Sequence, residues 1–176
     1  MCGIAGFTGP GTREDLVRMT RLLSDRGPDD EGYAENEGVF LGHRRLSILD
    51  LEGGAQPMWD GDGTLGIVFN GEIYNFAELR EELVRCGRVF RTDHSDTEVL
   101  LAAYAEWGDA MVDRLNGMWA FVIHDRKRRR LFASRDRFGK KPFYYHHAPG
   151  LGLFVFASEL DALLAHPDVP RGINAA

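Results

Sequence analysis

The chain has 176 residues, of which 44% are hydrophobic and 27% charged, a composition typical of a folded globular domain and unlike that of disordered or collagenous chains. The formal net charge of −6 disfavours a general nucleic-acid binder, because phosphate backbones are bound by positive charge. No apolar run approaches the roughly 20 residues of a membrane helix, and the N-terminus lacks a secretion signal. We therefore expect a cytoplasmic protein with one domain over residues 1–176, its core spanning about 2–165 before a short C-terminal tail.

In the first third of the chain the pattern predicts a strand, a helix and further strand segments. Gly3–Thr8 is a short apolar run, and Thr12 is a typical helix N-cap. The helix should end near Gly27-Pro28, because proline disfavours helical geometry in the residue before it. Strand-like segments follow between Val39 and Leu49. The apolar side chains expected to share the buried face of the helix are Leu16, Met19, Leu22 and Leu23.

The middle of the chain predicts a strand followed by two helices. The strand, Leu65–Phe69, ends in Asn70-Gly71. A capping residue with a glutamate three positions later then occurs twice, which is the capping-box pattern of a helix start. The two pairs are Asn75 with Glu78, before a helix ending at Gly87, and Ser95 with Glu98, before a helix over 99–107.

The last third is rich in predicted strands, and a short helix over 158–165 closes it. The strand segments are nearly continuously apolar, which indicates that both faces of each strand are covered. Their large aromatic side chains are expected in the core. Stacked sheets with helices outside them are thus the expected arrangement. The segments are 118–123, 131–134, 142–146 and 151–157, and the aromatic residues are Trp119, Phe121, Phe154 and Phe156.

Three conspicuous polar segments are interpreted as structural. The basic run 126–130 lies between two apolar runs, which favours a hairpin turn over a nucleic-acid contact. Asp60 and Asp62 imitate the start of a calcium loop, but later positions of that loop lack the required glycine and glutamate, so a hairpin turn is favoured again. His146 and His147 point to opposite faces of a strand. No metal site is expected.

The two cysteines have different settings. Cys86 shares a helix face with Leu79 and Leu83, which predicts a buried structural thiol. Cys2 follows the initiator Met, whose removal would give Cys2 a free α-amine beside its thiol. An α-amine titrates near about 7.7–8.0 and a thiol near about 8.5, so the amine can accept the thiol proton. Cys2 is therefore a candidate nucleophile, the alternative being a second residue without a chemical role.

Groups that could assist such a nucleophile lie further along the chain. Asn70 and Gly71 offer a side-chain amide and an accessible backbone N–H for an oxyanion, and Glu72 adds a carboxylate, although Asn-Gly is also a common turn. Asp96 follows the predicted N-cap Ser95 and could bind an ammonium group or simply complement the helix dipole. An arginine could pair with a substrate carboxylate, but the residue types alone do not choose between Arg44 and Arg45.

Eight segments of the sequence, in order along nearly the whole chain, resemble class II glutamine amidotransferase domains. The resemblance is strongest to the N-terminal glutaminase domain of glutamine-hydrolysing asparagine synthetases. The segments are MCGIAGF at 1–7, RGPD at 26–29, RLSI at 45–48, NGEIYN at 70–75, SDTE at 95–98, GMWAF at 117–121, RDRFGKKPFYY at 135–145 and ASEL at 157–160.

This resemblance implies an α+β fold of the N-terminal-nucleophile hydrolase type, a four-layer αββα sandwich with two mainly antiparallel sheets. It implies that Cys2 is the nucleophile with its own α-amine as base, and that Asn70 and Gly71 form the oxyanion hole. Arg45, rather than Arg44, would hold the α-carboxylate of L-glutamine. The further substrate-binding positions that it implies are Glu72 and Asp96, with Asp96 at the α-ammonium, and the backbone of Leu46, Ser47, Ile48 and Leu49.

The implied reaction is hydrolysis of glutamine to glutamate and ammonia through a γ-glutamyl thioester on Cys2, with no cofactor. The ammonia would serve a synthetase domain or subunit that uses ATP and Mg, as in asparagine synthesis. Such a domain is not found within these 176 residues, so asparagine synthesis by this chain alone is not expected. A truncated product, an excised fragment and a stand-alone subunit all stay open, as does a homodimer.

Two alternatives to the enzyme are kept. A non-catalytic domain that binds glutamine or regulates a partner would use the same pocket without releasing ammonia, and a metal-binding module is disfavoured by the absent ligand spacing. The segment Leu51–Gly54 is expected to close over bound glutamine, because it contains glycines and follows the residues that would line the pocket.

Overall fold

The computed structural model describes residues 1–46 and 54–172. The chain divides into two compact units, each containing one antiparallel sheet. Unit 1 comprises Met1–Leu46 with Pro142–Ala176, and unit 2 comprises Ser47–Lys141. The predicted fold class, two mainly antiparallel sheets accompanied by helices, is confirmed.

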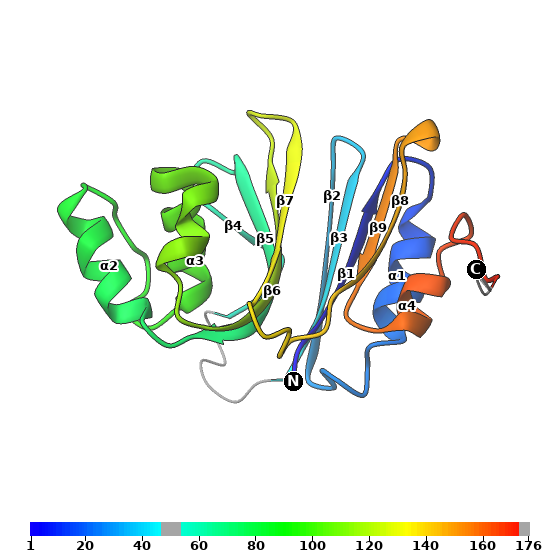
Figure 1. Cartoon of the computed structure of the whole chain (residues 1–176), viewed down its shortest axis with the longest axis horizontal. Helices are drawn as coiled ribbons and strands as arrows, with labels where there is room; N and C mark the ends of the chain where they lie inside the picture. The colour runs from blue at the N-terminus through cyan, green and yellow to red at the C-terminus, as the bar shows by residue number, and fades with distance from the viewer. Residues whose placement is uncertain (47–53, 173–176) are drawn as a thin grey trace. The chain divides into compact units, whose positions relative to one another are not determined.

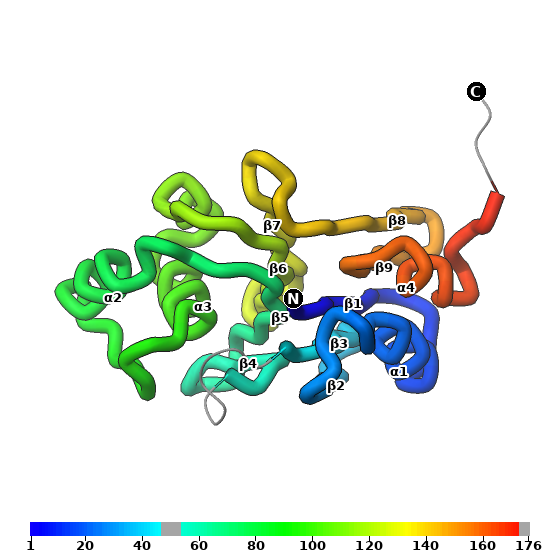
Figure 2. Tube along the Cα trace, turned by 90° about the horizontal axis from the view of Figure 1, so that it is seen from below, coloured from blue at the N-terminus to red at the C-terminus, as the bar shows by residue number. Residues whose placement is uncertain are grey.

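The sheet of unit 1 has five strands in the order β2-β3-β1-β9-β8 (Figure 1). The N-terminal strand β1 lies between β3 and β9, as Figure 2 also shows. Helices α1 and α4 cover one face, where Phe7, Leu16 and Leu163 belong to one apolar core. The elements of this unit are β1 (Gly3–Thr8), α1 (Arg13–Arg21), β2 (Asp30–Asn36), β3 (Val39–Arg45), β8 (Tyr144–Ala148), the 3-10 turn η2 (Pro149–Leu151), β9 (Leu153–Ala157) and α4 (Leu160–Leu164).

Helix α1 begins as predicted and ends earlier than predicted. Thr12 and Asp15 form a reciprocal capping box at its start. After Arg21 the chain continues in turns, so Leu22 is 49% exposed and the prediction that it shares the buried face is wrong. The turns bring Gly27 so close to the backbone of Arg44 that a Cβ atom on Gly27 would lie 2.4 Å from the Arg44 carbonyl carbon. Only glycine fits this contact.

Strand β2 has no counterpart among the predicted elements. Its sequence, DEGYAEN, is polar and largely lacks buried side chains, so no apolar pattern marks it. It forms because its backbone pairs with β3 along the whole length, from Asp30 opposite Arg45 to Asn36 opposite Val39. Backbone pairing at a sheet edge can thus define a strand that side-chain burial does not.

The sheet of unit 2 has four strands in the order β4-β5-β6-β7, with α3 packed on β5 and α2 packed on α3 (Figure 1). Its core joins Ile67, Phe69, Leu100 and Phe121. Strand β5 continues through Asn70-Gly71, with Asn70 opposite Ala120 and Gly71 opposite Trp119, so the turn interpretation of this dipeptide is wrong. The elements are β4 (Met58–Trp59), β5 (Leu65–Ile73), α2 (Phe76–Arg85), α3 (Asp96–Trp107), the 3-10 helix η1 (Gly108–Arg114), β6 (Gly117–Asp125) and β7 (Arg130–Arg135).

The two predicted capping boxes have different outcomes. The Ser95 hydroxyl accepts from the backbone N–H of Glu98, as predicted for the start of α3. The Glu98 carboxylate instead accepts from the backbone of Arg91 and Thr92. Asn75 makes no capping bond, because its side chain accepts from Asn116 N–H and donates to the Arg114 carbonyl. A tertiary contact therefore replaces the local cap at α2.

Two-sided burial holds for only some of the late strands. The residues of β6 and β9 are mostly buried, as predicted, whereas β7 and β8 are partly exposed, which corrects the prediction for these two. Both are edge strands, which pair with a neighbouring strand along one edge only and are more exposed than central strands. Of the four aromatic residues assigned to the core, Trp119, Phe121 and Phe156 are buried and Phe154 is half-buried.

Both predicted hairpin turns are confirmed. The basic run forms the turn between β6 and β7, where Asp125 accepts from the Arg128 backbone and side chain. In the turn before β5, the Asp60 carboxylate accepts from the backbone N–H groups of Thr64 and Leu65. The Asp60 carboxylate therefore stabilises the turn.

Cys86 is exposed at the end of α2, so the prediction of a buried structural thiol is wrong. The helix ends at Arg85, and Cys86 and Gly87 leave the buried face on which Leu79 and Leu83 lie. None of the helices within residues 1–46 and 54–172 combines the length and apolar character needed to cross a membrane.

His166 should make the stability of unit 1 pH-dependent. Its ring is buried edge-on against Phe7, and burial lowers its pKa below the usual 6.5, with the nearby charges of Asp15 and Asp168 opposing this effect. As pH falls below about 6.5 the unfolded state binds a proton before the folded state does, so stability decreases until the lowered pKa is reached. Urea unfolding at about pH 7.5 and about pH 5.5 should show a larger loss for the wild type than for His166→Gln. An identical loss in both proteins would contradict the assignment to His166.

Candidate functional site

Strand alternation places Cys2 and Arg45 of unit 1, and Asn70 of unit 2, on the sheet face opposite the helices of their own unit. In unit 1, Phe7 faces the helices, so residues of β1 with even numbers, and Cys2 just before it, lie on the other side. Gly42 of β3 faces α1, where a Cβ atom would lie 2.2 Å from the Thr20 hydroxyl, which puts Arg45 on the same side as Cys2. Both candidates therefore occupy one face of one sheet.

The backbone of Cys2 is held by a buried guanidinium. Arg26 Nε donates to the Cys2 carbonyl at 2.9 Å, and Arg26 Nη1 contacts Glu159 Oε1 at 3.3 Å. The Cys2 thiol is partly buried, 4.0 Å from the Leu46 carbonyl oxygen. Arg26 lies in the RGPD segment but received no role from the sequence, since a residue type alone does not indicate which backbone carbonyl it will bind.

Structural contacts separate Arg44 from Arg45. Arg44 donates to the Gly27 carbonyl at 2.8 Å and pairs with Glu31 at 2.7 Å, so its guanidinium holds the loop before β2 to β3. Arg45 is only 8% exposed and projects from the opposite face of β3. The two arginines, which residue type alone does not distinguish, therefore differ in their structural settings.

In unit 2 the side chain of Asn70 is buried with an unused donor. Asn70 is 1% exposed, and within the described part of the chain its Nδ2 atom has no hydrogen-bond partner. Phe69, the residue before it, faces the core of unit 2, so Asn70 lies on the face opposite α3. An unsatisfied buried amide costs about 1–3 kcal/mol, and such groups are typical of sites that bind a ligand.

Asp96 begins α3 beside the end of β5. Its Oδ2 atom accepts from the Ile73 backbone N–H at 3.1 Å, which brings it next to Glu72 in the same unit. Burial raises the pKa of Asp96 above the usual 3.8, and the charge of Glu72 acts in the same direction. Two carboxylates, one of them poorly hydrated, form a favourable environment for a cation.

Part of the predicted site cannot be located. Ser47, Ile48 and Leu49 lie outside the described residues, as do residues 51–53 of the segment expected to close over glutamine. Leu46 is described, and the Cys2 thiol lies 4.0 Å from its carbonyl oxygen.

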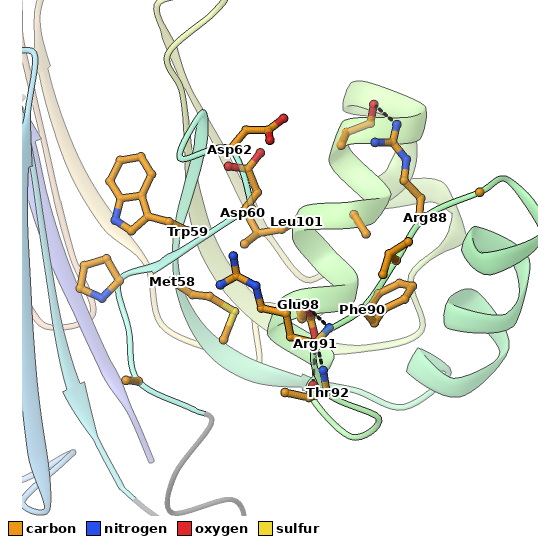
Figure 3. Close-up of a pocket in the computed structure, with 17 residues that line it drawn as sticks. Met58, Trp59, Asp60, Asp62, Arg88, Phe90, Arg91, Thr92, Glu98 and Leu101 are labelled. Carbon is orange, nitrogen blue, oxygen red and sulfur yellow. Dashed lines mark hydrogen bonds between the residues drawn. The ribbon is translucent and has the colours of Figure 1, made fainter.

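A separate pocket of about 660 Å³ in unit 2 contains none of the predicted site residues (Figure 3). It lies between the segment around β4, the connection from α2 to α3, and the flank of α3. Three of its charged side chains already have partners: Asp60 in its turn, Glu98 on the Arg91 and Thr92 backbone, and Arg88 with Glu106. The side chains of Asp62 and Arg91, which also line it, are exposed. We therefore do not assign chemistry to it.

Comparison with known proteins points to one family. A family model described as "Glutamine amidotransferase domain" matches residues 1–176. Asparagine synthetase (glutamine-hydrolyzing) 3 of Bacillus subtilis strain 168 is 47% identical, with 99% of this chain covering 29% of that protein. Asparagine synthetase (glutamine-hydrolyzing) 3 of Arabidopsis thaliana is 40% identical, with 93% of this chain covering 28% of that protein. This chain thus spans under a third of the length of either relative.

A solved structure shares the fold. It is the glutamine phosphoribosylpyrophosphate amidotransferase of B. subtilis in complex with ADP and GMP, with a TM-score of 0.77 over 94% of this chain and 44% of that one. The sequence identity is 21%.

Gly71 should not tolerate a side chain. A Cβ atom there would lie 2.3 Å from the Met118 carbonyl oxygen and 2.5 Å from the Phe69 ring. Gly71→Ala should therefore lower the free energy of unfolding by about 1–3 kcal/mol or more, measured by urea unfolding. Gly150→Ala is the control, because nothing lies within 4 Å of its added Cβ. Equal stability of the two variants would contradict the close contact.

Proposed function

This chain belongs to the glutamine amidotransferase domain family, and from that premise we propose that it hydrolyses L-glutamine to glutamate and ammonia with Cys2 as nucleophile. The observation that carries the proposal is the buried Nδ2 donor of Asn70, which has no hydrogen-bond partner among the described residues and precedes Gly71, where a side chain does not fit. A tetrahedral intermediate of acyl transfer is stabilised by such preorganised donors. Asn70 and the Gly71 backbone N–H are the proposed oxyanion hole.

The proposed reaction has two steps. After removal of Met1, the α-amine of Cys2 accepts the thiol proton, and the thiolate attacks the side-chain amide carbon of glutamine. The carbon–nitrogen bond breaks, and the proton held by the amine leaves with the ammonia. Water then attacks the γ-glutamyl thioester, which releases glutamate and restores the thiol. No redox cofactor or metal is required for this balance.

The proposal assigns substrate recognition to charged side chains. Arg45 would pair with the α-carboxylate, for which a guanidinium offers two parallel donors. Asp96, assisted by Glu72, would bind the α-ammonium, since its poorly hydrated carboxylate gains a counter-charge on binding. The backbone from Leu46 to Leu49 is proposed to line the same pocket.

The ammonia is proposed to serve a synthetase domain or subunit that uses ATP and Mg. The similarity to proteins named asparagine synthetases supports an acceptor of this kind, with asparagine synthesis as the reaction. We also propose a cytoplasmic location, where the thiol would stay reduced.

The central test is ammonia release from glutamine by the chain without ATP or added metal. Cys2→Ala should abolish ammonia release, because no other thiol would be placed to attack the side-chain amide of glutamine. Cys86→Ser should leave the release unchanged. Turnover in Cys2→Ala would refute the mechanism, and an intact mass that retains Met1 would refute the role of the α-amine. Glutamine that raises the melting temperature without ammonia release would instead favour a non-catalytic binding domain.

Asp96 should control the affinity for glutamine. Asp96→Asn should raise KM by about 10- to 100-fold, the value of a hydrogen bond between charged groups, with a smaller change in kcat. In the wild type KM should rise as pH falls toward the raised pKa of Asp96, because the protonated carboxyl cannot neutralise an ammonium; the variant should lack this dependence. Asp62→Asn, at an exposed position, is the control. A KM unchanged by Asp96→Asn would remove the residue from the site.

A further inference from the structure

We propose that Ser158 and Glu159, in the ASEL segment before α4, are positioning residues that fix the backbone of Cys2 for attack. The inference rests on the proposed function and extends it to a segment that neither the sequence nor the catalytic scheme gave a role. Neither residue is assigned a contact with substrate. Both would act through other residues of unit 1.

Strand pairing holds the first residues of β1 on the β3 side only. Pairing of β1 with β3 extends to Gly3 opposite Arg44, but pairing with β9 ends at Ala5 opposite Ala157. Cys2 would be the first residue of the mature chain, and chain ends fray unless they are tied down. A nucleophile at that place therefore needs further contacts, since a displacement of about 1 Å can cost about 100-fold in rate.

Ser158 extends the ladder between β1 and β9 by means of its side chain. Its hydroxyl accepts from the Ile4 backbone N–H at 3.0 Å, and its own N–H donates to the Ile4 carbonyl at 2.8 Å. Ser158 is fully buried. Because both bonds are shielded from water, they fix Ile4, two residues beyond the nucleophile, on the side where strand pairing has ended.

Glu159 orients the guanidinium that holds Cys2 itself. Arg26 donates through Nε to the Cys2 carbonyl at 2.9 Å and through Nη1 to Glu159 at 3.3 Å. A guanidinium is planar, so a carboxylate bound to one of its edges restricts the direction of the other donors. Glu159 stands at the N-cap of α4 but makes no capping bond. Its contact is with Arg26, whose side chain is 11% exposed.

The chain offers a closely matched control for Glu159. Glu82 pairs with Arg114 at 2.6 Å, and its side chain is 41% exposed, against 42% for Glu159. The two carboxylates have the same chemistry and nearly the same exposure, whereas Arg114 is 43% exposed against 11% for Arg26. Glu82 and Arg114 belong to unit 2 and contact neither Cys2 nor Ile4 among the contacts described. Glu82→Gln therefore reports what loss of such a pair costs without an effect on the nucleophile.

The test compares glutamine hydrolysis by Glu159→Gln and Glu82→Gln. Glu159→Gln should lower kcat on the order of 10- to 100-fold while KM changes by less than about twofold, because substrate-binding groups are untouched. Its unfolding midpoint should match that of Glu82→Gln. In Arg26→Lys, addition of Glu159→Gln should cause little further loss, since both changes break one chain of contacts. A kcat equal to that of Glu82→Gln, or additive losses, would overturn the inference.

A measurement without turnover separates this inference from the proposed function. Amide hydrogen exchange followed by NMR should be faster at Ile4 in Glu159→Gln and in Ser158→Ala than in the wild type, while Phe7, paired on both sides, keeps its rate. Unchanged exchange at Ile4 in both variants would refute the positioning role. Failure of the wild type to release ammonia would refute the proposed function and leave the exchange result to decide the positioning role. Glu159→Gln carries the test if Ser158→Ala, at a buried site, does not fold.

Discussion

Backbone pairing between β5 and β6 places Asn70 in a buried position in which its amide Nδ2 has no hydrogen-bond partner among residues 1–46 and 54–172. The strand pairs along nine residues, so its register cannot change at one position without loss of pairing elsewhere. A buried donor left unpaired opposes folding, and the rest of the strand must offset that cost. Such a cost is understandable where the missing partner is a ligand oxygen. Gly71 is part of the same pairing, and its backbone lies so close to the Met118 carbonyl that a side chain would not fit.

In unit 1 a different feature stands out, which is how the backbone at the start of β1 is held in place. Strand β1 is central in its sheet, but its first residues are paired on one side only. Polar contacts from Arg26 and Ser158 supply the missing bonds. Since β1 lies between β3 and β9, segments from both ends of the chain take part. The backbone of Cys2 and Ile4 is therefore held by side chains where pairing with β9 has ended.

The known proteins resemble this chain in two different ways. The family match extends over residues 1–176, whereas the chain covers under a third of the two synthetases compared here. The similarity to the solved amidotransferase concerns the fold, since only 21% of residues are identical. The fold is thus shared at low sequence identity, and a shared fold does not by itself specify a function.

The sequence by itself determined the element types wherever apolar patterns are strong, as in β1, β5, β6 and the start of α1, and the family resemblance came from eight short motifs along the chain. It did not determine β2, which backbone pairing defines, or the exposure of Cys86, which depends on where α2 ends. Asn-Gly was ambiguous because local turn preference and strand pairing compete, and the partner strand decided the outcome. Likewise, the resemblance favoured Arg45 over Arg44, but only the tertiary structure showed the contacts that hold Arg44 elsewhere and joined Glu159 to Arg26, because these contacts link residues distant in sequence.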